Sequence, residues 1–382
     1  VDRGKSPFSY QTSKLYNGKN IEPGSFIGSN ELVVGKGNKD FPTVSKVAIW
    51  ELIILDHDAT EEELTKIKNY FVKTYPWLFF DQAWTVTGKT NEDEDRATIA
   101  NITGNGNNLV LSNFGFAEGS GYGLYKTPFE LYPSVQHSSK YSLSFSKFAL
   151  GDHNLIIAPK QNDLSYDIKV KVTGLKDGVK FKWGWIGTTG YIDITTDGIH
   201  MLNKPASQIR QLIVEFAEDF DPDHVVTIEQ IPEYEGYLVT DGVDDKAVSK
   251  QFKFGENFTV ILDFKFPVKK ISYCGFDLSS KVRIQNLQGS GVYVVLKGNK
   301  TLIPSNVVRA VTSEGKVYDE NWNEYNIVPG NISSNYTMVN LGFDGSNQFA
   351  ESATKLAGIY SSALSKDDCI KAYNYLQTLK SK

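Results

Sequence analysis

The chain has 382 residues, enough for two or three domains, and its 40 Lys and Arg against 45 Asp and Glu give a formal net charge of −5. It has no run of like charges that would bind nucleic acid or anionic lipid, and no apolar run approaches the roughly 18 residues of a membrane-spanning helix. With only Cys274 and Cys369, it can build neither a disulfide framework nor a Cys-rich zinc site. The sequence thus predicts neither nucleic acid nor membrane as a partner.

The composition favours an all-β fold. Aromatic residues make up 13% of the chain, and they fall with β-branched residues in short runs that Gly, Asn and Asp separate. We therefore expect strands to dominate every domain.

Residues 1–76 carry motifs that return in the same order about 305 residues later. The matched segments are 20–24 with 326–330, 32–35 with 339–342, 46–48 with 355–357, and 69–71 with 374–376. Each copy ends in a strand, a polar turn and a helix, for which Thr60 and Ser365 are the expected caps. The first copy shows strands only near 14–16, 31–34 and 47–55, which predicts the C-terminal half of a sandwich, a partial jelly roll.

Such a half sandwich would expose its inner face to water, and this exposure costs a free energy of about 25 cal/mol for each Å² of apolar surface. Its inner apolar positions, such as Val33, Ile49 and Leu64, therefore need a cover. We expect a segment outside the chain or a neighbouring copy to supply this cover. Packing on the region that follows, from residue 77 onward, is the less favoured alternative.

Two regions of different character separate the copies. Residues 77–160 are rich in Gly, Asn and Ser, and are expected to be a loop-rich connecting or assembly region. Residues 161–234 contain short β-rich runs with glycines between them, which predicts a small immunoglobulin-like sandwich.

Residues 235–382 have the complete strand pattern of a two-sheet sandwich, followed by the capped helix. The expected strands are 258–266, 281–287, 291–296, 306–312, 337–343 and 355–360. We therefore predict that 237–382 folds alone as a jelly roll.

Three motifs in this part, DGVDD at 241–245, AGIY at 357–360 and ALSKDD at 363–368, resemble the opening and closing signatures of laminin G-like, concanavalin A-like lectin domains. The stretches 88–99, 103–107, 113–116 and 227–232 are similar to segments of head- and tail-fibre proteins of crAss-like phages of gut Bacteroides. The resemblance implies a virion fibre or decoration protein that displays glycan-binding sandwiches.

No pattern for catalysis is found. Laminarinase-type hydrolases place paired carboxylates at alternate positions of one strand, and no expected strand has this arrangement. The acidic run 92–95 lies among turn-forming residues, and the five His have no metal-ligand spacing. We therefore expect no enzymatic activity.

Two binding sites are candidates. Asp241, Asp244 and Asp245 cluster at one turn and could hold calcium, although turn chemistry alone also favours Asp there. Calcium is therefore a possible cofactor, and no other is indicated.

Sugar binding needs an exposed aromatic face beside polar groups. Trp322, with Asn321, Asn323 and Tyr325 beside it, is the best candidate, and the alternative is an aromatic side chain that covers the core.

Two functions follow from these observations. The first is a non-enzymatic fibre or decoration protein at the virion surface, with a host-surface glycan and other virion proteins as partners and with a homo-oligomeric assembly. The alternative is a carbohydrate-binding module of a bacterial surface or secreted protein, or of a polysaccharide-degrading enzyme.

Overall fold

The computed structural model describes residues 59–381, apart from short gaps, and before them only 15–16 and 19–20. The gaps are 117–118, 126–128, 133–138, 147–155, 160–166, 177–178, 186–191, 203–209, 217–220, 268–271, 280, 287–291, 333–335 and 345–347. The chain forms two compact units, Val1–Phe79 and Phe80–Lys382.

In the first unit, β1 (Leu15–Tyr16) and β2 (Lys19–Asn20) pair as a hairpin, and α1 (Glu61–Thr74) leads into the 3-10 helix η1 (Pro76–Leu78). The expected cap is confirmed: the Thr60 hydroxyl accepts from the Glu63 amide at 3.2 Å, and the Glu63 carboxylate accepts from the Thr60 amide at 2.9 Å. The strands expected at 31–34 and 47–55 lie outside the described residues.

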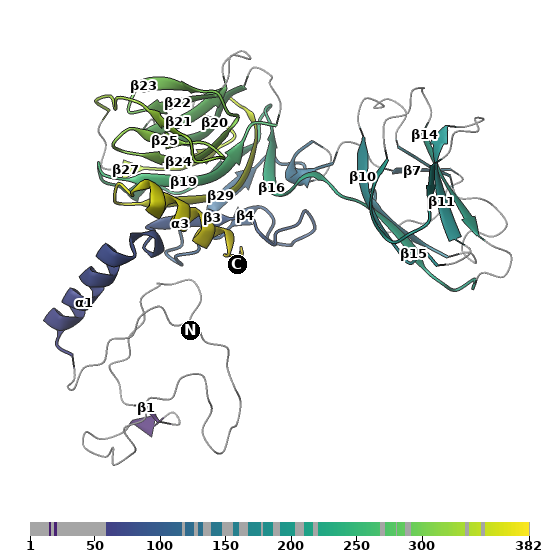
Figure 1. Ribbon diagram of the computed structural model, residues 1–382, viewed down its shortest axis with the longest axis horizontal. Coiled ribbons are helices and arrows are strands. Elements are labelled where there is room, and N and C mark those ends of the chain that lie inside the picture. Colours follow the sequence, from purple (N-terminus) through teal and green to yellow (C-terminus); the bar gives the residue numbers. More distant parts are fainter. Residues whose placement is uncertain are drawn as a thin grey trace. The chain divides into compact units, whose positions relative to one another are not determined.

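The second unit contains a β-sandwich of two eight-stranded antiparallel sheets (Figure 1). The first sheet consists of β26 (Glu324–Asn326), β25 (Lys316–Tyr318), β24 (Val307–Thr312), β19 (Thr259–Lys265), β29 (Glu351–Tyr360), β16 (Glu233–Asp241) and β6 (Gly121–Leu124) in this order, with β3 (Gln82–Thr85) also paired to β29. The second consists of β23 (Asn299–Ile303), β22 (Val292–Leu296), β21 (Val282–Asn286), β20 (Ser272–Leu278), β28 (Val339–Leu341), β17 (Lys246–Val248), β5 (Leu109–Ser112) and β4 (Thr98–Ile99). A small ladder of β18 (Phe252–Lys253) and β27 (Tyr336–Thr337) accompanies them. The all-β expectation is confirmed.

The boundary expected at residue 235 is wrong, because β3, β4, β5 and β6 come from the region expected to be loops. β3 pairs with β29, β5 with β17, and β6 with β16. Trp84, Leu109 and Tyr122 from these strands belong to the same buried core as Phe258 and Phe276. The sequence signal was weak because each of the four strands has only two to four residues.

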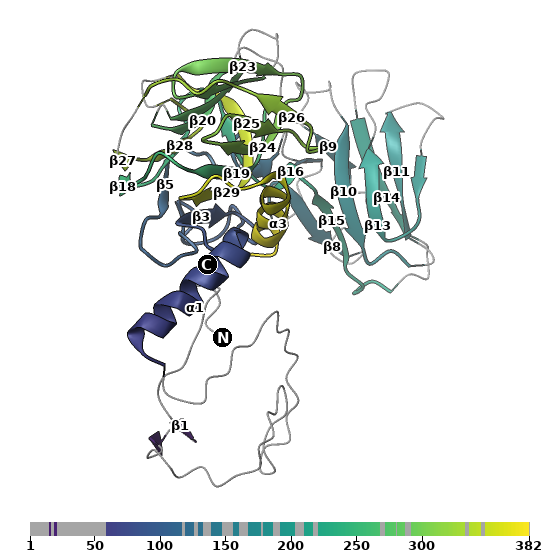
Figure 2. The same cartoon turned by 60° about the vertical axis from the view of Figure 1, so that its left-hand side comes forward.

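A second, smaller sandwich is inserted between β6 and β16. One of its sheets is β13 (Gly198–Leu202), β10 (Ile168–Thr173), β15 (Val226–Gln230) and β8 (Ser142–Phe145), and the other is β12 (Ile192–Ile194), β11 (Val179–Trp185), β14 (Arg210–Phe216), β9 (Ile156–Pro159) and β7 (Phe129–Tyr132) (Figure 2). The sandwich expected from 161 therefore begins earlier, at β7. Leu124 pairs with Glu233, so the insertion starts and ends at adjacent positions of one β-ladder.

Helix α3 (Lys366–Gln377) packs on β19 and β29 at the outer face of the first sheet, as both views show (Figures 1 and 2). Ser365 caps the helix as expected, since its hydroxyl accepts from the Asp368 amide at 3.2 Å. Leu376 can reach the sheet because Gly358 has no side chain: a Cβ on Gly358 would lie 2.5 Å from Leu376 Cδ1. None of the helices described has the length and apolarity needed to cross a bilayer.

Candidate functional site

Of the four residues expected to contact sugar, Asn321, Trp322 and Asn323 lie in the turn that follows β25, and Tyr325 lies in β26 directly after it. Asp319 is buried and organises them: its carboxylate accepts from the amides of Asn321 and Asn323, from the Asn323 side chain and from the Tyr325 hydroxyl, each at 2.9 Å. Burial alone would raise the pKa of Asp319, but these hydrogen bonds outweigh it and hold the pKa below its usual value.

Trp322, at the tip of this turn, has a backbone conformation that is rare for its residue type. Its φ is 61°, in the left-handed region that costs a bulky residue roughly 1–2 kcal/mol. Its ring is half-buried and packs edge-on against Tyr373 of α3, with a centroid distance of 5.8 Å. The turn therefore fixes Trp322 beside α3 and leaves part of its ring open to solvent.

Next to Tyr373, the buried Asp263 of β19 joins two strands and the helix. Its carboxylate pairs with Arg309 of β24 and accepts from the Tyr373 hydroxyl at 3.1 Å and from Gln377 at 2.8 Å. Tyr237 of β16 donates its hydroxyl to the same carboxylate at 2.9 Å. Burial alone would raise the pKa of Asp263, but the charge of Arg309 and the hydrogen bonds have the larger effect together and lower it below its usual value.

Cations and rings alternate along the face that continues from Asp263. The Arg309 guanidinium lies 4.6 Å from the centre of the Tyr373 ring, and the Lys265 ammonium lies 4.0 Å from that of Tyr237 and 4.7 Å from that of Tyr234. All three distances are within the range of cation–π attraction. All five side chains are half-buried.

We call this surface the aromatic strip; its members are Trp322, Tyr373, Arg309, Tyr237, Lys265 and Tyr234, with Asp263 beneath them. Ring faces for stacking and charged donors for hydroxyl or carboxylate groups stand side by side on it, a combination that recognises sugars. Only Trp322 was expected from the sequence. The others come from three strands and one helix that are far apart in sequence, so no pattern of residue spacing predicts that they lie together.

The three acidic residues expected to bind metal are also brought together. Asp241 ends β16, and Asp244 and Asp245 lie in the turn between β16 and β17; one carboxylate oxygen of each lies within 4.8 Å of the others. In the first sheet, β24, β19 and β29 separate β16 from β25. The acidic turn and the Trp322 turn are therefore different sites.

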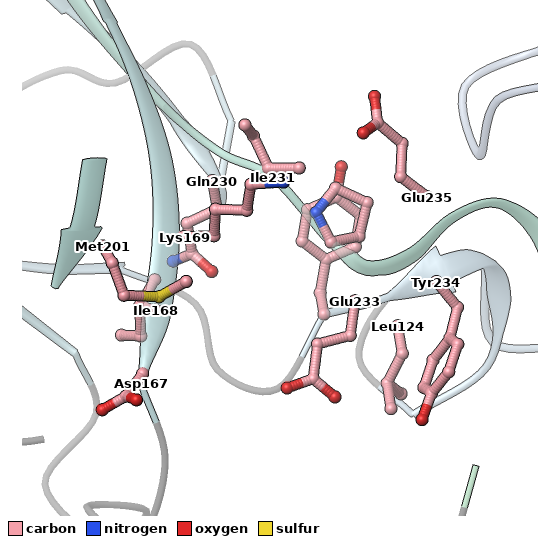
Figure 3. A pocket seen from close by; sticks show the side chains of 12 residues that line it. Leu124, Asp167, Ile168, Lys169, Met201, Gln230, Ile231, Glu233, Tyr234 and Glu235 are labelled. Atoms are coloured by element: carbon pink, nitrogen blue, oxygen red, sulfur yellow. The ribbon is translucent and has the colours of Figure 1, made fainter. Parts of the chain in front are cut away.

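A cavity of about 250 Å³ lies where the chain passes from β15 into β16 (Figure 3). Its polar lining is mainly acidic, with Asp167, Glu233 and Glu235, and Tyr234 reaches it from the aromatic strip. Tyr125, which also lines it, stacks on Tyr141 with a centroid distance of 4.1 Å. Because three carboxylates dominate the polar lining of the cavity, we take the strip as the candidate sugar-contacting surface.

No protein-family model matches the chain, and no curated protein matches it. Among solved structures, it is similar to the Trypanosoma rangeli sialidase in complex with sialic acid, at 10% identity and a TM-score of 0.31 over 63% of this chain and 45% of the sialidase. It is also similar to the full extracellular region of zebrafish Gpr126/Adgrg6, at 9% identity and a TM-score of 0.26 over 66% of this chain and 37% of that chain. The chain thus spans less than half the length of either protein, and at these scores neither likeness bears on its function.

Proposed function

We propose that this chain is a non-enzymatic glycan-binding protein and that the aromatic strip contacts the sugar. The observation that carries the proposal is the set of contacts from Trp322 through Tyr373 to Arg309, and from Arg309 through the shared Asp263 carboxylate to Tyr237 and Lys265. Their fixed geometry lowers the entropy lost on binding, because the packing and the hydrogen bonds to Asp263 and Asp319 already restrict these side chains.

The wider setting that we propose is a head- or tail-fibre or decoration protein at a virion surface, where glycan binding attaches the particle to its host. This setting rests on the sequence resemblance alone. The alternative is a carbohydrate-binding module of a bacterial surface or secreted protein. A homo-oligomer in light scattering favours the fibre, and a monomer that binds a defined glycan favours the module.

Glycan-array screening of the full chain, followed by calorimetry on the strongest ligand, tests the proposal. Trp322→Ala removes the stacking surface and should weaken binding about tenfold or more, the effect of roughly 1.4 kcal/mol. Tyr237→Ala should also weaken binding, because it removes the ring below Lys265.

The matched control is Tyr293→Ala. Tyr293 lies in β22 of the other sheet and carries the same kind of contact, with the Lys300 ammonium 5.3 Å from its ring centre. The control should leave the affinity unchanged. Equal losses in Tyr293→Ala and Trp322→Ala would show that the strip is not the site, and sugar release that depends on a specific Asp or Glu pair would overturn the non-enzymatic assignment.

A further inference from the structure

The loop between β4 and β5 presents an Asn-Gly dipeptide to solvent. Asn105 and Gly106 are exposed, and Gly104 and Gly106 have φ of 74° and 75°, in the left-handed region. A Cβ added to Gly106 would meet no atom within 4 Å. Among the described residues, none forms a hydrogen bond with the Gly106 amide. The peptide that follows Asn105 is therefore open to solvent and its nitrogen is unengaged.

Hydrogen bonds hold the Asn105 side chain in a compact turn over that peptide. Its Oδ1 accepts from the Asn107 amide at 2.9 Å, which closes a ring that also contains the Asn105 Cγ and the Gly106 nitrogen. Its Nδ2 donates to Gln82 Oε1 at 3.1 Å. The turn thus keeps the Asn105 Cγ near the Gly106 nitrogen. It also directs a donor at the oxygen that would gain charge if that carbon were attacked.

We propose that Asn105 and Gly106 form a site of spontaneous backbone modification. The Gly106 nitrogen gives its proton to hydroxide and attacks the Asn105 Cγ, so that a new C–N bond forms. The bond from Cγ to Nδ2 breaks, and ammonia leaves with a proton from water. One water molecule then opens the cyclic imide at either of its carbonyls, which gives aspartate or its β-linked isomer. Water is the only co-reactant.

The same loop contains two asparagines that lack this setting. Asn107 is buried and precedes Asn108, and Asn108 precedes Leu109 of β5. A side chain on the following residue hinders close approach to its nitrogen, whereas glycine does not. Asn107 and Asn108 are therefore internal controls for the reaction at Asn105.

The modification changes how the loop is held to β3. Three side-chain amides donate to Gln82 Oε1: those of Asn101 at 2.6 Å, Asn105 at 3.1 Å and Asn107 at 3.2 Å. After the reaction, residue 105 turns an acceptor-only carboxylate toward this oxygen, so a donor is lost and two acceptors face each other. The Asn107 carbonyl accepts from Trp84 Nε1 at 2.8 Å, so the loosened loop also weakens a contact to the core.

The test follows the full chain in mildly alkaline buffer by peptide mass spectrometry, with fragmentation that separates aspartate from its β-linked isomer. Asn105 should convert at least about tenfold faster than Asn107 and Asn108. Its rate in the folded protein should stay within about tenfold of the rate in urea, because the turn holds the reacting atoms together. A rate no faster than at Asn107 and Asn108, or a larger slowing in the folded protein, overturns the proposal.

Two variants check the chemistry. Gly106→Ala should slow the conversion at least about tenfold, because the added methyl group hinders the attack. Since φ of Gly106 is 75°, this variant is strained, and Asn105→Gln is the second variant. Its side chain is one methylene longer and would have to close a larger ring, so residue 105 should keep its amide. Loss of ammonia from residue 105 in Asn105→Gln at the wild-type rate would contradict the mechanism.

A third variant measures the consequence for the fold. Asn105→Asp imitates one product and should lower the unfolding temperature of the full chain by about 2–4 °C, the effect of one lost hydrogen bond. The matched control is Asn108→Asp, which adds the same charge to the same loop but keeps the acceptor for the Asn101 amide, now at 3.0 Å from Asn108 Oδ1. The control should unfold at the wild-type temperature. Equal unfolding temperatures of the two variants would contradict the loosening of the loop.

Discussion

Residues 237–382 expressed alone should fail to unfold cooperatively, whereas 80–382 should show a cooperative transition. The shorter fragment lacks β3 to β6 and the residues beside them, which together supply seven members of the buried core: Trp84, Val86, Ile99, Leu109, Leu111, Phe114 and Tyr122. Burying one large apolar side chain contributes about 1.5–3 kcal/mol, so their joint loss is comparable with the whole net stability of a domain, about 5–15 kcal/mol. Circular dichroism and thermal unfolding of both fragments make the comparison.

A designed control separates the missing strands from the missing middle sandwich. Because Leu124 pairs with Glu233, residues 125–232 can be replaced by Asn-Gly, a dipeptide that closes a two-residue hairpin between these two residues. This shortened form of 80–382 should remain folded and cooperative. A compact, cooperative monomer from 237–382 would contradict the assignment of the early strands to this core, as would an unfolded shortened form.

Asp263→Ala should destabilise the large sandwich by about 3 kcal/mol or more, because it leaves the partly buried Arg309 without its counter-charge. It also removes the acceptor of the Tyr237 and Tyr373 hydroxyls and of Gln377. The midpoint of urea unfolding measures the effect in full-length protein. Asp367→Asn, an exposed acid of α3, is the control and should stay within about 0.5 kcal/mol of wild type.

The same side chain predicts a pH dependence of stability. The pKa of Asp263 is lower in the folded chain than its usual value of about 3.9. Its stabilising contribution is therefore fully present above about pH 4 and is lost as the pH falls through the lower, folded-state pKa. The difference in stability between wild type and Asp263→Ala should shrink below about pH 4. A difference that stays constant down to pH 2 would show that the carboxylate charge is not what stabilises the site.

Local chemistry explains which parts of the fold were predictable. The helices at Glu61–Thr74 and Lys366–Gln377 begin where Thr60 and Ser365 place a hydroxyl three residues before a matching amide, a signal confined to four residues. The strand expected at 258–266 is β19, a mostly apolar run in which every residue but Lys265 is buried and from which Val260, Leu262 and Phe264 belong to the core.

Pairing partners were not predictable in the same way. The run at 82–85 is too short to predict a strand from sequence. It forms a strand by pairing with β29, which lies more than 260 residues later in the chain. The pairing of β6 with β16 could not be predicted either, because the middle sandwich separates the two strands in sequence although they are neighbours in the sheet. The aromatic strip was missed for the same reason, because the contact of Arg309 with Tyr373 exists only after α3 packs on the sheet.

Hydrogen–deuterium exchange of the full chain, with and without the strongest glycan ligand, tests the central claim most directly. If the aromatic strip binds the sugar, exchange should slow in three segments that are distant in sequence: 316–326 around Trp322, 233–241 around Tyr237, and 366–377 around Tyr373. The Trp322→Ala variant should show no such protection at the same ligand concentration. Slowed exchange confined to the middle sandwich, at 129–230, with these three segments unchanged, would contradict the account.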